Sequence, residues 1–584
     1  MSPLSPDVAA DWRRVRRYAV PRWMIERATE RRLAGDWRGA CAAAHVDVAF
    51  DPSDIAACHG TDVAATLADD LRHLAPDLLR WHLPRVMGGR STVEPDLTVV
   101  LARYGVPGAA DAPWLHLTTP PMVQGPQRLT LRCSPLRSAG SGAARPDWTT
   151  ARHLWDARHA AELRERSGGN AVRSPFCHPD GTPLVTAELP SADPGDDDPA
   201  AHAEWVTLLH ENGETAAAFA AAGIDLDIDL TTTLTHGWYR VDPEEVLRRR
   251  AFALTRLAPE IRLLMRRGAG GRFRVAEDWR TSVLLELTDP GPTGRLRVGI
   301  VEREDCAGVP LLPAALWQRL PDIDLVRAGG IAPARLHPLV AGALFPALAV
   351  TDGPAGPPGP TPPERVRVRC RGAWHPMESR GGVLTMPHTD EEQRRERALR
   401  AFGGAVAGCF AVQEVWASGR GRLPRGLRAQ RQELFLRAQH GDTPGVRELL
   451  DAGVDPRVRD GSGRGLLHVL HLIDHETLLP RLLAAGLDLE ACDHLGRTPL
   501  YTAVADRGSA ALVRALLAAG ARIDVVDGMG LSLDQVIRKY RRSDLAFLRD
   551  RVQREHPGVG ADWWDEWEYE QDPEEDEEEQ EENA

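Results

Sequence analysis

Hydrophobic and turn-forming positions recur with a fixed period in the last third of the chain. Segments that begin with Asp and contain a Gly start at positions 460, 493 and 527, so neighbouring starts lie 33 and 34 residues apart. A leucine and a glycine recur with the same spacing, as Leu450, Leu483 and Leu517 and as Gly453, Gly486 and Gly520. This period predicts a stack of similar units, each with a turn and two helices, in which the leucines face neighbouring units.

The stretch "GRTPLYTA", which starts at Gly496, shows how one unit is built. Thr498 is suited to cap the first helix, and Pro499 then occupies the first helical position, where a missing N–H costs nothing. Gly520 is suited to the left-handed conformation that ends the second helix. With its period and its Thr-Pro helix start, the segment 428–555 resembles the ankyrin repeat family. It departs from the family pattern at Tyr501, where a His is usual, and at Gly465-Leu466, which replaces Thr-Pro.

The resemblance implies an all-α solenoid that binds another protein and carries no chemistry of its own. Ankyrin repeats use their hairpin tips and the surfaces of their first helices as an extended concave face. Mapped onto this sequence, that face comprises Arg459, Ser462, His494, Leu495, Tyr501 and Met529.

The front of the chain contains an internal match. Residues 34–51 align without a gap with residues 212–229, and further matches follow in the same order. They pair His59-Gly60 with His236-Gly237 and "RLTLRC", ending at Cys133, with "RVRVRC", ending at Cys370. We therefore predict two homologous modules, 18–189 and 200–418, joined by a Pro/Asp-rich linker.

Each module begins with the pattern of a helical hairpin and continues with alternating strand patterns. The expected strands are "LTVVLAR", "WLHLTT" and "RLTLRC" in the first copy and "SVLLELTD", "RLRVGIV" and "RVRVRC" in the second. The predicted fold class is therefore multidomain, with two α+β modules in tandem, an all-α ankyrin solenoid and a disordered acidic tail at 556–584.

Composition places the chain among multidomain proteins that stay outside membranes. Of the residues, 43% are hydrophobic and 27% are charged, and the apolar runs at 339–350 and 405–412 are too short to span a bilayer. No secretory signal core follows the Arg-rich start, so we expect a cytoplasmic protein. The 8 Cys contain no C-x-x-C pair, which predicts reduced thiols, no metal site and no cofactor. The use of Arg in place of Lys is typical of a GC-rich bacterial genome.

The net charge of -13 is concentrated at the C-terminus. From Asp562 onward the tail carries fourteen carboxylates and no base, so the remainder is close to neutral (-13 + 14 = +1). Trp563 and Trp567 stand four residues apart among these acids, and one helical turn would place both on one face. The tail is either a segment that folds onto a basic, apolar-floored groove or a solubilising polyanion.

Candidate chemistry is sparse. The best enzyme candidates are His59 and His236, each in a module copy that also carries Asp47 or Asp225. A His oriented by a carboxylate can act as a base or supply half of a metal site, whereas a His-Gly step is also common at a helix C-terminus. The acidic stretch 225–229 lacks the Gly and Glu of a calcium loop, and no phosphate-binding or nucleophile motif is present.

Three functions remain open at this point. The sequence favours a non-enzymatic cytoplasmic interaction or scaffold protein, whose ankyrin array binds a protein and whose modules bind a second protein or a small ligand. The alternative is an enzyme with an unrecognised site in the modules. The third is an Arg-mediated nucleic-acid binder, against which the neutral body and the lack of aromatics on a basic stripe both speak.

Overall fold

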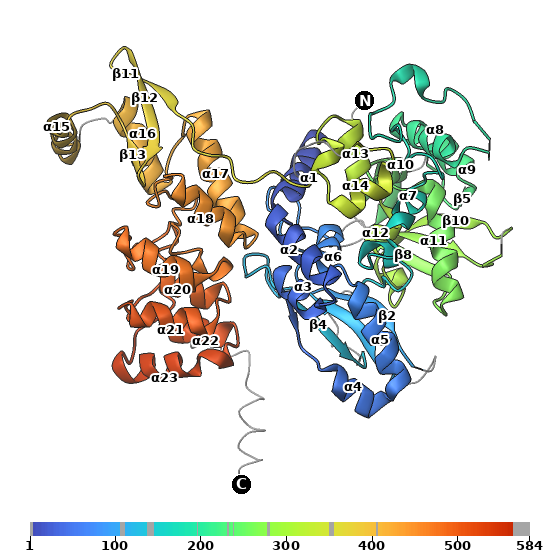
Figure 1. Ribbon diagram of the computed structural model, residues 1–584, viewed down its shortest axis with the longest axis horizontal. Helices are drawn as coiled ribbons and strands as arrows, with labels where there is room; N and C mark the ends of the chain where they lie inside the picture. The colour runs from blue at the N-terminus through green and yellow to red at the C-terminus, as the bar shows by residue number, and fades with distance from the viewer. Residues whose placement is uncertain are drawn as a thin grey trace, which may run out of the picture. The chain divides into compact units, whose positions relative to one another are not determined.

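The computed structural model describes residues 4–105, 111–136, 145–195, 197–230, 233–236, 239–276, 281–291, 293–349, 355–403 and 407–564 (Figure 1). The chain forms two compact units. Unit 1 comprises Met1–Val123 and Arg128–Pro358, and unit 2 comprises Gln124–Gln127 and Gly359–Ala584. Trp567 and most of the predicted acidic tail lie outside the described residues.

The first half of unit 1 begins with helices and continues with a sheet. The helices are α1 (Pro6–Tyr18), α2 (Arg22–Leu33), α3 (Trp37–Ala43), α4 (Pro52–His59), α5 (Thr61–His73) and α6 (Pro76–His82). Asp36 caps α3 by accepting the Gly39 N–H at 2.8 Å, so the expected helical hairpin is present as α2 and α3.

The sheet of this half contains β1 (Val46–Val48), β2 (Thr98–Arg103), β3 (Trp114–Thr118) and β4 (Leu129–Ser134). Its order is β1-β4-β3-β2, with β1 parallel to β4 and the other pairs antiparallel. Leu129 and Leu131 of β4 are buried and Arg132 is exposed, as the alternating pattern predicts. The expected strands of the first copy are therefore all present.

The second half of unit 1 repeats this arrangement with its own elements. Its main helices are α8 (Pro199–Glu211), α9 (Thr215–Ala221), α10 (Pro243–Arg248) and α11 (Leu254–Arg266). Its sheet has the order β5-β10-β9-β8, and β5 is parallel to β10. The strands are β5 (Ile224–Leu226), β8 (Arg272–Ala276), β9 (Thr281–Leu287) and β10 (Leu296–Glu302). The region is thus mixed helix and sheet, and the shared strand order favours the duplication, which stays a prediction.

Shorter elements complete unit 1. They are α7 (Leu163–Arg166), β6 (Leu234–His236), β7 (Tyr239–Val241), α12 (Ala314–Trp317), α13 (Pro321–Arg327) and α14 (Pro338–Leu344). Single 3-10 turns occur at Arg152–Leu154, Ala160–Glu162, Thr186–Glu188, Glu304–Cys306 and Pro333–Arg335. One continuous core, which includes Trp81, Trp155, Phe219 and Phe252, runs through both halves of the unit.

One proposed strand match is wrong. We expected "RVRVRC" to occupy the sheet position of "RLTLRC", but β10 holds the place that corresponds to β4. The segment "RVRVRC" forms β11 (Val366–Cys370) of a separate sheet in unit 2, with β12 (Ala373–Arg380) and β13 (Val383–Thr385). Alternating Arg and hydrophobic residues fit any sheet with one exposed face. This pattern therefore predicts a strand but does not identify the strand with which it pairs. The predicted module end at 418 therefore does not coincide with the division between Pro358 and Gly359.

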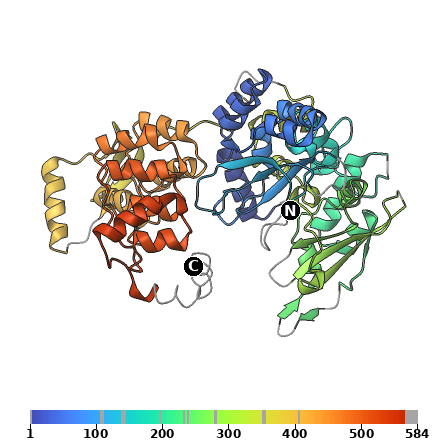
Figure 2. The same ribbon diagram turned by 90° about the horizontal axis from the view of Figure 1, so that it is seen from below.

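Unit 2 continues into the helices of the ankyrin array, which stack in chain order (Figures 1 and 2). Before the array come α15 (Asp390–Ala401) and α16 (Gly408–Ser418). The array contains α17 (Arg425–Gln439), α18 (Thr443–Asp451), α19 (His475–Ala484), α20 (Pro499–Ala505), α21 (Ala510–Ala518), α22 (Leu533–Lys539) and α23 (Ala546–Glu555), with 3-10 turns at Leu470–Leu472 and Ser543–Leu545.

Local details of the array follow the sequence closely. The Tyr501 N–H donates to Thr498 Oγ1 at 3.3 Å, and Pro499 is the first residue of α20. Gly520 has a φ of 98°, the left-handed region expected where α21 ends. In the preceding unit, Gly465-Leu466 replaces Thr-Pro, and the first α-helix is replaced by turns and a 3-10 segment. The first α-helix does not form in this unit because the capping Thr and the Pro at the first helical position are both missing.

The end of the described tail region packs onto the array. Trp564 is buried, and Lys539 Nζ lies 4.8 Å from the centroid of its ring. Trp563, the neighbouring residue, remains 47% exposed. Among the described residues, no helix is both long and apolar enough to cross a bilayer.

We predict that Leu516→Ala lowers the stability of unit 2 by about 2 to 5 kcal/mol, because this completely buried side chain fills the space between α21 and its neighbours. Chemical denaturation of the full chain, followed by hydrogen exchange of the two units, measures the effect. Leu517→Ala, at a half-buried neighbouring position, is the matched control and should cost much less. An equal loss of protection in unit 1 would contradict an independently stabilised array.

Candidate functional site

The hairpin turns of the array share one hydrogen-bonding pattern. Each turn begins with an aspartate whose Oδ1 accepts the N–H groups of the residues two and four positions further on. The pairs are Ser462 and Arg464 at Asp460, Leu495 and Arg497 at Asp493, and Met529 and Leu531 at Asp527, all at 2.8 to 3.0 Å. The aspartate side chain thus holds each turn in a fixed shape.

Neighbouring turns are also joined to one another. The His494 N–H donates to the Ser462 carbonyl at 2.9 Å, and the Gly528 N–H donates to the Leu495 carbonyl at 2.6 Å. A Cβ at Gly528 would lie 2.9 Å from that carbonyl oxygen, so only glycine allows the approach. The turns therefore form a continuous, rigid edge along the array.

The side chains at the tips of this edge are exposed and partly apolar. Ser462, Leu495 and Met529 occupy the same position in successive turns, and the last two expose 59% and 63% of their surface. Val526, beside the last turn, is 41% exposed. We call Ser462, Leu495, Val526 and Met529 the turn row.

The other residues assigned to the binding face have structural contacts. Arg459 Nη1 donates to the Cys492 carbonyl at 2.6 Å and so links adjacent turns. His494 is exposed, and its Nε2 lies 3.2 Å from the Ser418 carbonyl oxygen. Tyr501 needs correction as a surface residue, because its side chain is only 2% exposed and packs in the core of unit 2. Burial, with the carboxylate of Asp527, raises the pKa of Tyr501. The first turn of α20 faces inward here, which the period alone did not reveal.

In the residues that the structure describes, the aspartate candidates of the modules pair with arginines, and the side chain of His236 lies outside the described residues. Asp47 accepts from Arg128 Nε at 2.9 Å, and Asp225 pairs with Arg295 at 2.8 Å, so each carboxylate ties its edge strand, β1 or β5, to the start of the neighbouring parallel strand. His59 is the last residue of α4, whereas His236 lies in β6. In the part of the chain that the structure describes, His59 contacts neither Asp47 nor Asp51. His59 and His236, which we predicted to occupy equivalent positions in the two modules, therefore lie in different kinds of secondary structure.

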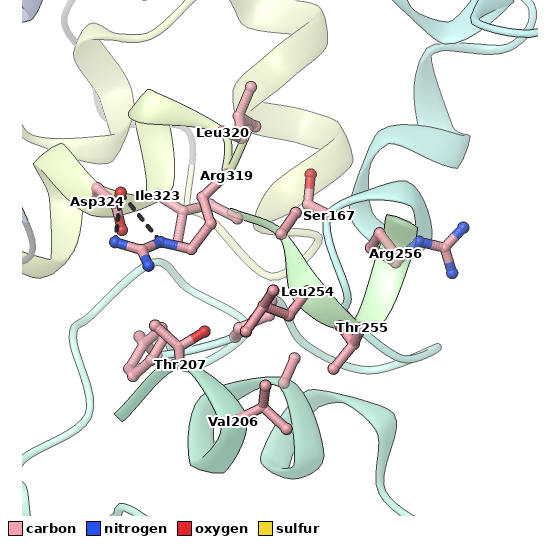
Figure 3. A pocket seen from close by; sticks show the side chains of 14 residues that line it. Ser167, Val206, Thr207, Leu254, Thr255, Arg256, Arg319, Leu320, Ile323 and Asp324 are labelled. Atoms are coloured by element: carbon pink, nitrogen blue, oxygen red, sulfur yellow. Dashed lines mark hydrogen bonds and ion pairs between the residues drawn. The ribbon is translucent and has the colours of Figure 1, made fainter. Parts of the chain in front are cut away.

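A small cavity in unit 1 is lined by Phe176, Leu254, Arg319 and Asp324 among others (Figure 3). Its volume is about 30 Å³, enough for a water molecule and too small for a substrate. Arg319 Nη2 bonds to Glu211 at 3.0 Å and to Asp324 at 3.3 Å. Burial raises the pKa of Asp324 although Arg319 opposes the shift. These charges satisfy one another, so this cavity is structural.

A larger cavity of about 410 Å³ also lies within unit 1, between its two halves. Its lining includes Arg85, His82 and His153, which are largely buried. Arg85 Nε and Nη1, His82 Nε2 and His153 Nδ1 are buried and have no hydrogen-bond partner in the protein. Burial, with the charges of Arg80 and Arg16, lowers the pKa of Arg85. Unpaired buried polar atoms in residues that line a cavity suit a place where a polar ligand or ordered water is held.

The structure also contains a cluster of cysteine and histidine side chains that the sequence analysis did not predict. Cys370, His375, His388 and Cys409 converge in unit 2, and one ligand atom from each lies within 4.8 Å of the others. Burial, with the neighbouring Cys370, raises the pKa of the Cys409 thiol to about 11. Cys370 and Cys409 do not form a C-x-x-C pair because they are far apart in the sequence, so that motif does not indicate the cluster. A Cys and a His beside a short hairpin, Cys370 and His375, were the available signal.

Comparisons with known proteins identify the repeats. Residues 434–527 match the family model described as "Ankyrin repeats (3 copies)", so the C-terminal part of the chain contains ankyrin repeats. A segment of 71 residues is 38% identical to "Transient receptor potential cation channel subfamily A member 1" of Homo sapiens. That match covers 12% of this chain and 6% of the relative. Ankyrin repeats generally bind other proteins.

We predict that the stability of unit 2 falls as the pH is lowered from about 6.5 towards 4, and that His468 contributes to this fall. Burial lowers the pKa of His468 to about 4, and its neutral form accepts the Gly465 N–H on Nδ1 at 3.1 Å. In this range the unfolded chain binds the proton and the folded chain does not, so acid favours unfolding by up to about 3 kcal/mol.

Thermal unfolding of the full chain as a function of pH, compared between wild type and His468→Gln, measures this contribution. The variant should be less stable at neutral pH and should lose less stability on acidification. His475→Gln is the control and should follow the wild-type curve. Parallel curves for wild type and His468→Gln would show that the pKa of His468 does not differ between the folded and unfolded states.

Proposed function

We propose that the protein is a non-enzymatic interaction protein that binds another protein through the turn row of its ankyrin array. The carrying observation is the exposure of Leu495 and Met529 at equivalent positions of adjacent turns that hydrogen bonds hold rigidly. A preorganised edge loses little conformational entropy on binding, and exposed apolar anchors supply the buried area. The partner therefore presents a complementary apolar strip.

A scaffold role and a cytoplasmic setting belong to the same proposal. All the cysteines are unpaired thiols, which suits a reducing compartment. The likeness to the human channel supports the repeats alone, because it covers a small part of either chain. Nothing of that protein's activity is transferred to this one.

We expect the double variant Leu495→Asp/Met529→Asp to bind the partner at least tenfold more weakly, because two charges would be placed where apolar side chains are buried. A candidate captured by wild type and lost by the variant is purified, and its affinity for each form is measured by calorimetry. Leu33→Asp, in α2 of unit 1, makes the same change at a side chain that is 75% exposed and is the control. Thermal unfolding checks that all three forms are folded. Equal affinity of wild type and double variant for every purified candidate would refute binding through the turn row.

A second function is favoured by the 410 Å³ cavity of unit 1, whose lining combines apolar residues and the carboxylate of Glu94 with arginines and histidines, some of which have unpaired buried atoms. We propose that it binds a small anion such as a phosphate or carboxylate. An Arg guanidinium presents several N–H donors that match such oxygens, and a buried Arg without a carboxylate partner is costly unless an anion neutralises it.

For this cavity we predict that inorganic phosphate, succinate or a nucleoside monophosphate raises the unfolding temperature of wild type, as ligand binding to the folded state requires. Arg85→Gln should abolish the rise, because it removes the charge and most of the donors. Arg267→Gln, at an exposed position at the end of α11, should preserve it. If no anion stabilises wild type, or if Arg85→Gln responds as wild type does, the cavity is not an anion site.

A further inference from the structure

Two cysteines and two histidines from four separate segments meet in unit 2. Cys370 is the last residue of β11, His375 lies in β12, His388 precedes α15, and Cys409 is the second residue of α16. Both thiols are buried, at 1% exposure or less, and the His388 side chain is 4% exposed. The convergence therefore occurs inside the protein and is not a chance grouping on the surface.

Three of the six distances between ligand atoms of the cluster are close to those of a tetrahedral metal site. His375 Nδ1 lies 3.1 Å from His388 Nε2, Cys370 Sγ lies 3.6 Å from His388 Nε2, and Cys409 Sγ lies 3.7 Å from His375 Nδ1. Zinc bonds of about 2.0 Å to nitrogen and about 2.3 Å to sulfur place neighbouring ligand atoms roughly 3.3 to 3.8 Å apart in a tetrahedron. Each of the ring atoms that faces another ligand is a nitrogen with a lone pair available in the neutral imidazole.

Residues around the cluster orient the candidate ligand side chains, as neighbouring residues do in metal sites. Glu392 Oε2 lies 3.6 Å from His388 Nδ1, on the side of the ring away from the cluster, where a carboxylate orients a metal-bound imidazole. The Phe410 ring packs against the His388 ring, with centroids 4.6 Å apart. A Cβ at Gly408 would lie 2.5 Å from Cys370 Sγ, so glycine is required for α16 to bring Cys409 this close.

We propose that Cys370, His375, His388 and Cys409 bind one structural zinc ion. Two sulfur and two nitrogen ligands in a tetrahedron suit Zn²⁺, and a site closed by four protein ligands leaves no position for a substrate. On binding, each thiol gives up its proton to solvent and becomes a thiolate, and the two imidazoles bind in their neutral form. Without a metal, the same atoms would be joined by one hydrogen bond between the two imidazoles and by weak contacts of the S–H groups.

The site also explains how the array begins. The Leu384 N–H of β13 donates to Asp455 Oδ2 at 3.1 Å, and the Arg459 N–H donates to the Trp416 carbonyl of α16 at 2.9 Å. The small sheet and α16 thus cover the first repeat, and zinc ties these two elements together. Since terminal units of a repeat array need a cap, zinc binding is coupled to the stability of the array. This inference does not depend on the proposed partner binding.

The test uses the full chain, purified under reducing conditions without an affinity tag that binds metals. Elemental analysis should find about one zinc per chain, and replacement by Co²⁺ should give the visible bands of a tetrahedral site with a thiolate-to-cobalt transition in the near ultraviolet. Cys370→Ser and Cys409→Ser should each lose the thiolate transition in part and bind zinc at least tenfold more weakly. Cys492→Ser changes an exposed thiol outside the cluster and should match wild type.

A metal chelator provides a second measurement that remains informative if a ligand variant folds poorly. It should lower the unfolding temperature of unit 2 in wild type and in Cys492→Ser, and zinc added in excess should restore it. Wild type that contains no zinc and gives no thiolate transition with Co²⁺ would overturn the proposal. Equal metal binding by wild type and the Cys370→Ser/Cys409→Ser double variant would overturn it as well.

Discussion

The structure of unit 2 depends on one constraint, which is that an ankyrin unit cannot bury its leucine face alone. Leu482, Leu512 and Leu516 become buried only because helices of neighbouring units lie on both sides. The array must therefore end in elements that cover the outermost faces. At the C-terminal side, α22 and α23 and the ring of Trp564 close the core. At the N-terminal side, the sheet β11-β12-β13 and α16 serve this role.

The same constraint gives the helices and the turns of each repeat different roles. One face of each helix packs on neighbouring units, and the turns carry exposed side chains at their tips. Asp460, Asp493 and Asp527 fix these turns through their side-chain oxygens, and hydrogen bonds between turns hold the tips in register. A rigid edge with exposed Leu495 and Met529 is consistent with binding, whereas buried Tyr501 serves packing.

Unit 1 shows how charge is handled in a different kind of core. Asp47 and Asp225 each bond to an arginine at the edge of a sheet, so the candidates for catalysis turn out to be ion pairs that join strands. Glu211, Arg319 and Asp324 neutralise one another beside a cavity too small for a ligand, and Figure 3 shows the pair of Arg319 and Asp324 in its lining. The larger cavity differs because Arg85 Nε and Nη1 lack partners within the protein, and this difference is the basis of the proposed anion site.

The sequence by itself determined the repeat period, the helix caps at Thr498 and Gly520, and strands β2, β3, β4, β9 and β10 of unit 1, because these depend on neighbouring residues and on local periodicity. It did not determine which sheet "RVRVRC" joins, since a half-exposed strand pairs wherever a partner edge is present. Nor did it show that Tyr501 faces inward or that His59 and His236 lie in different elements. The convergence of Cys370, His375, His388 and Cys409 was decided by tertiary structure, and only the proximity of Cys370 to His375 is visible in the sequence. Its ligand atoms are brought together by a hairpin, a turn and a helix, and no local pattern records distances between residues that far apart in the chain.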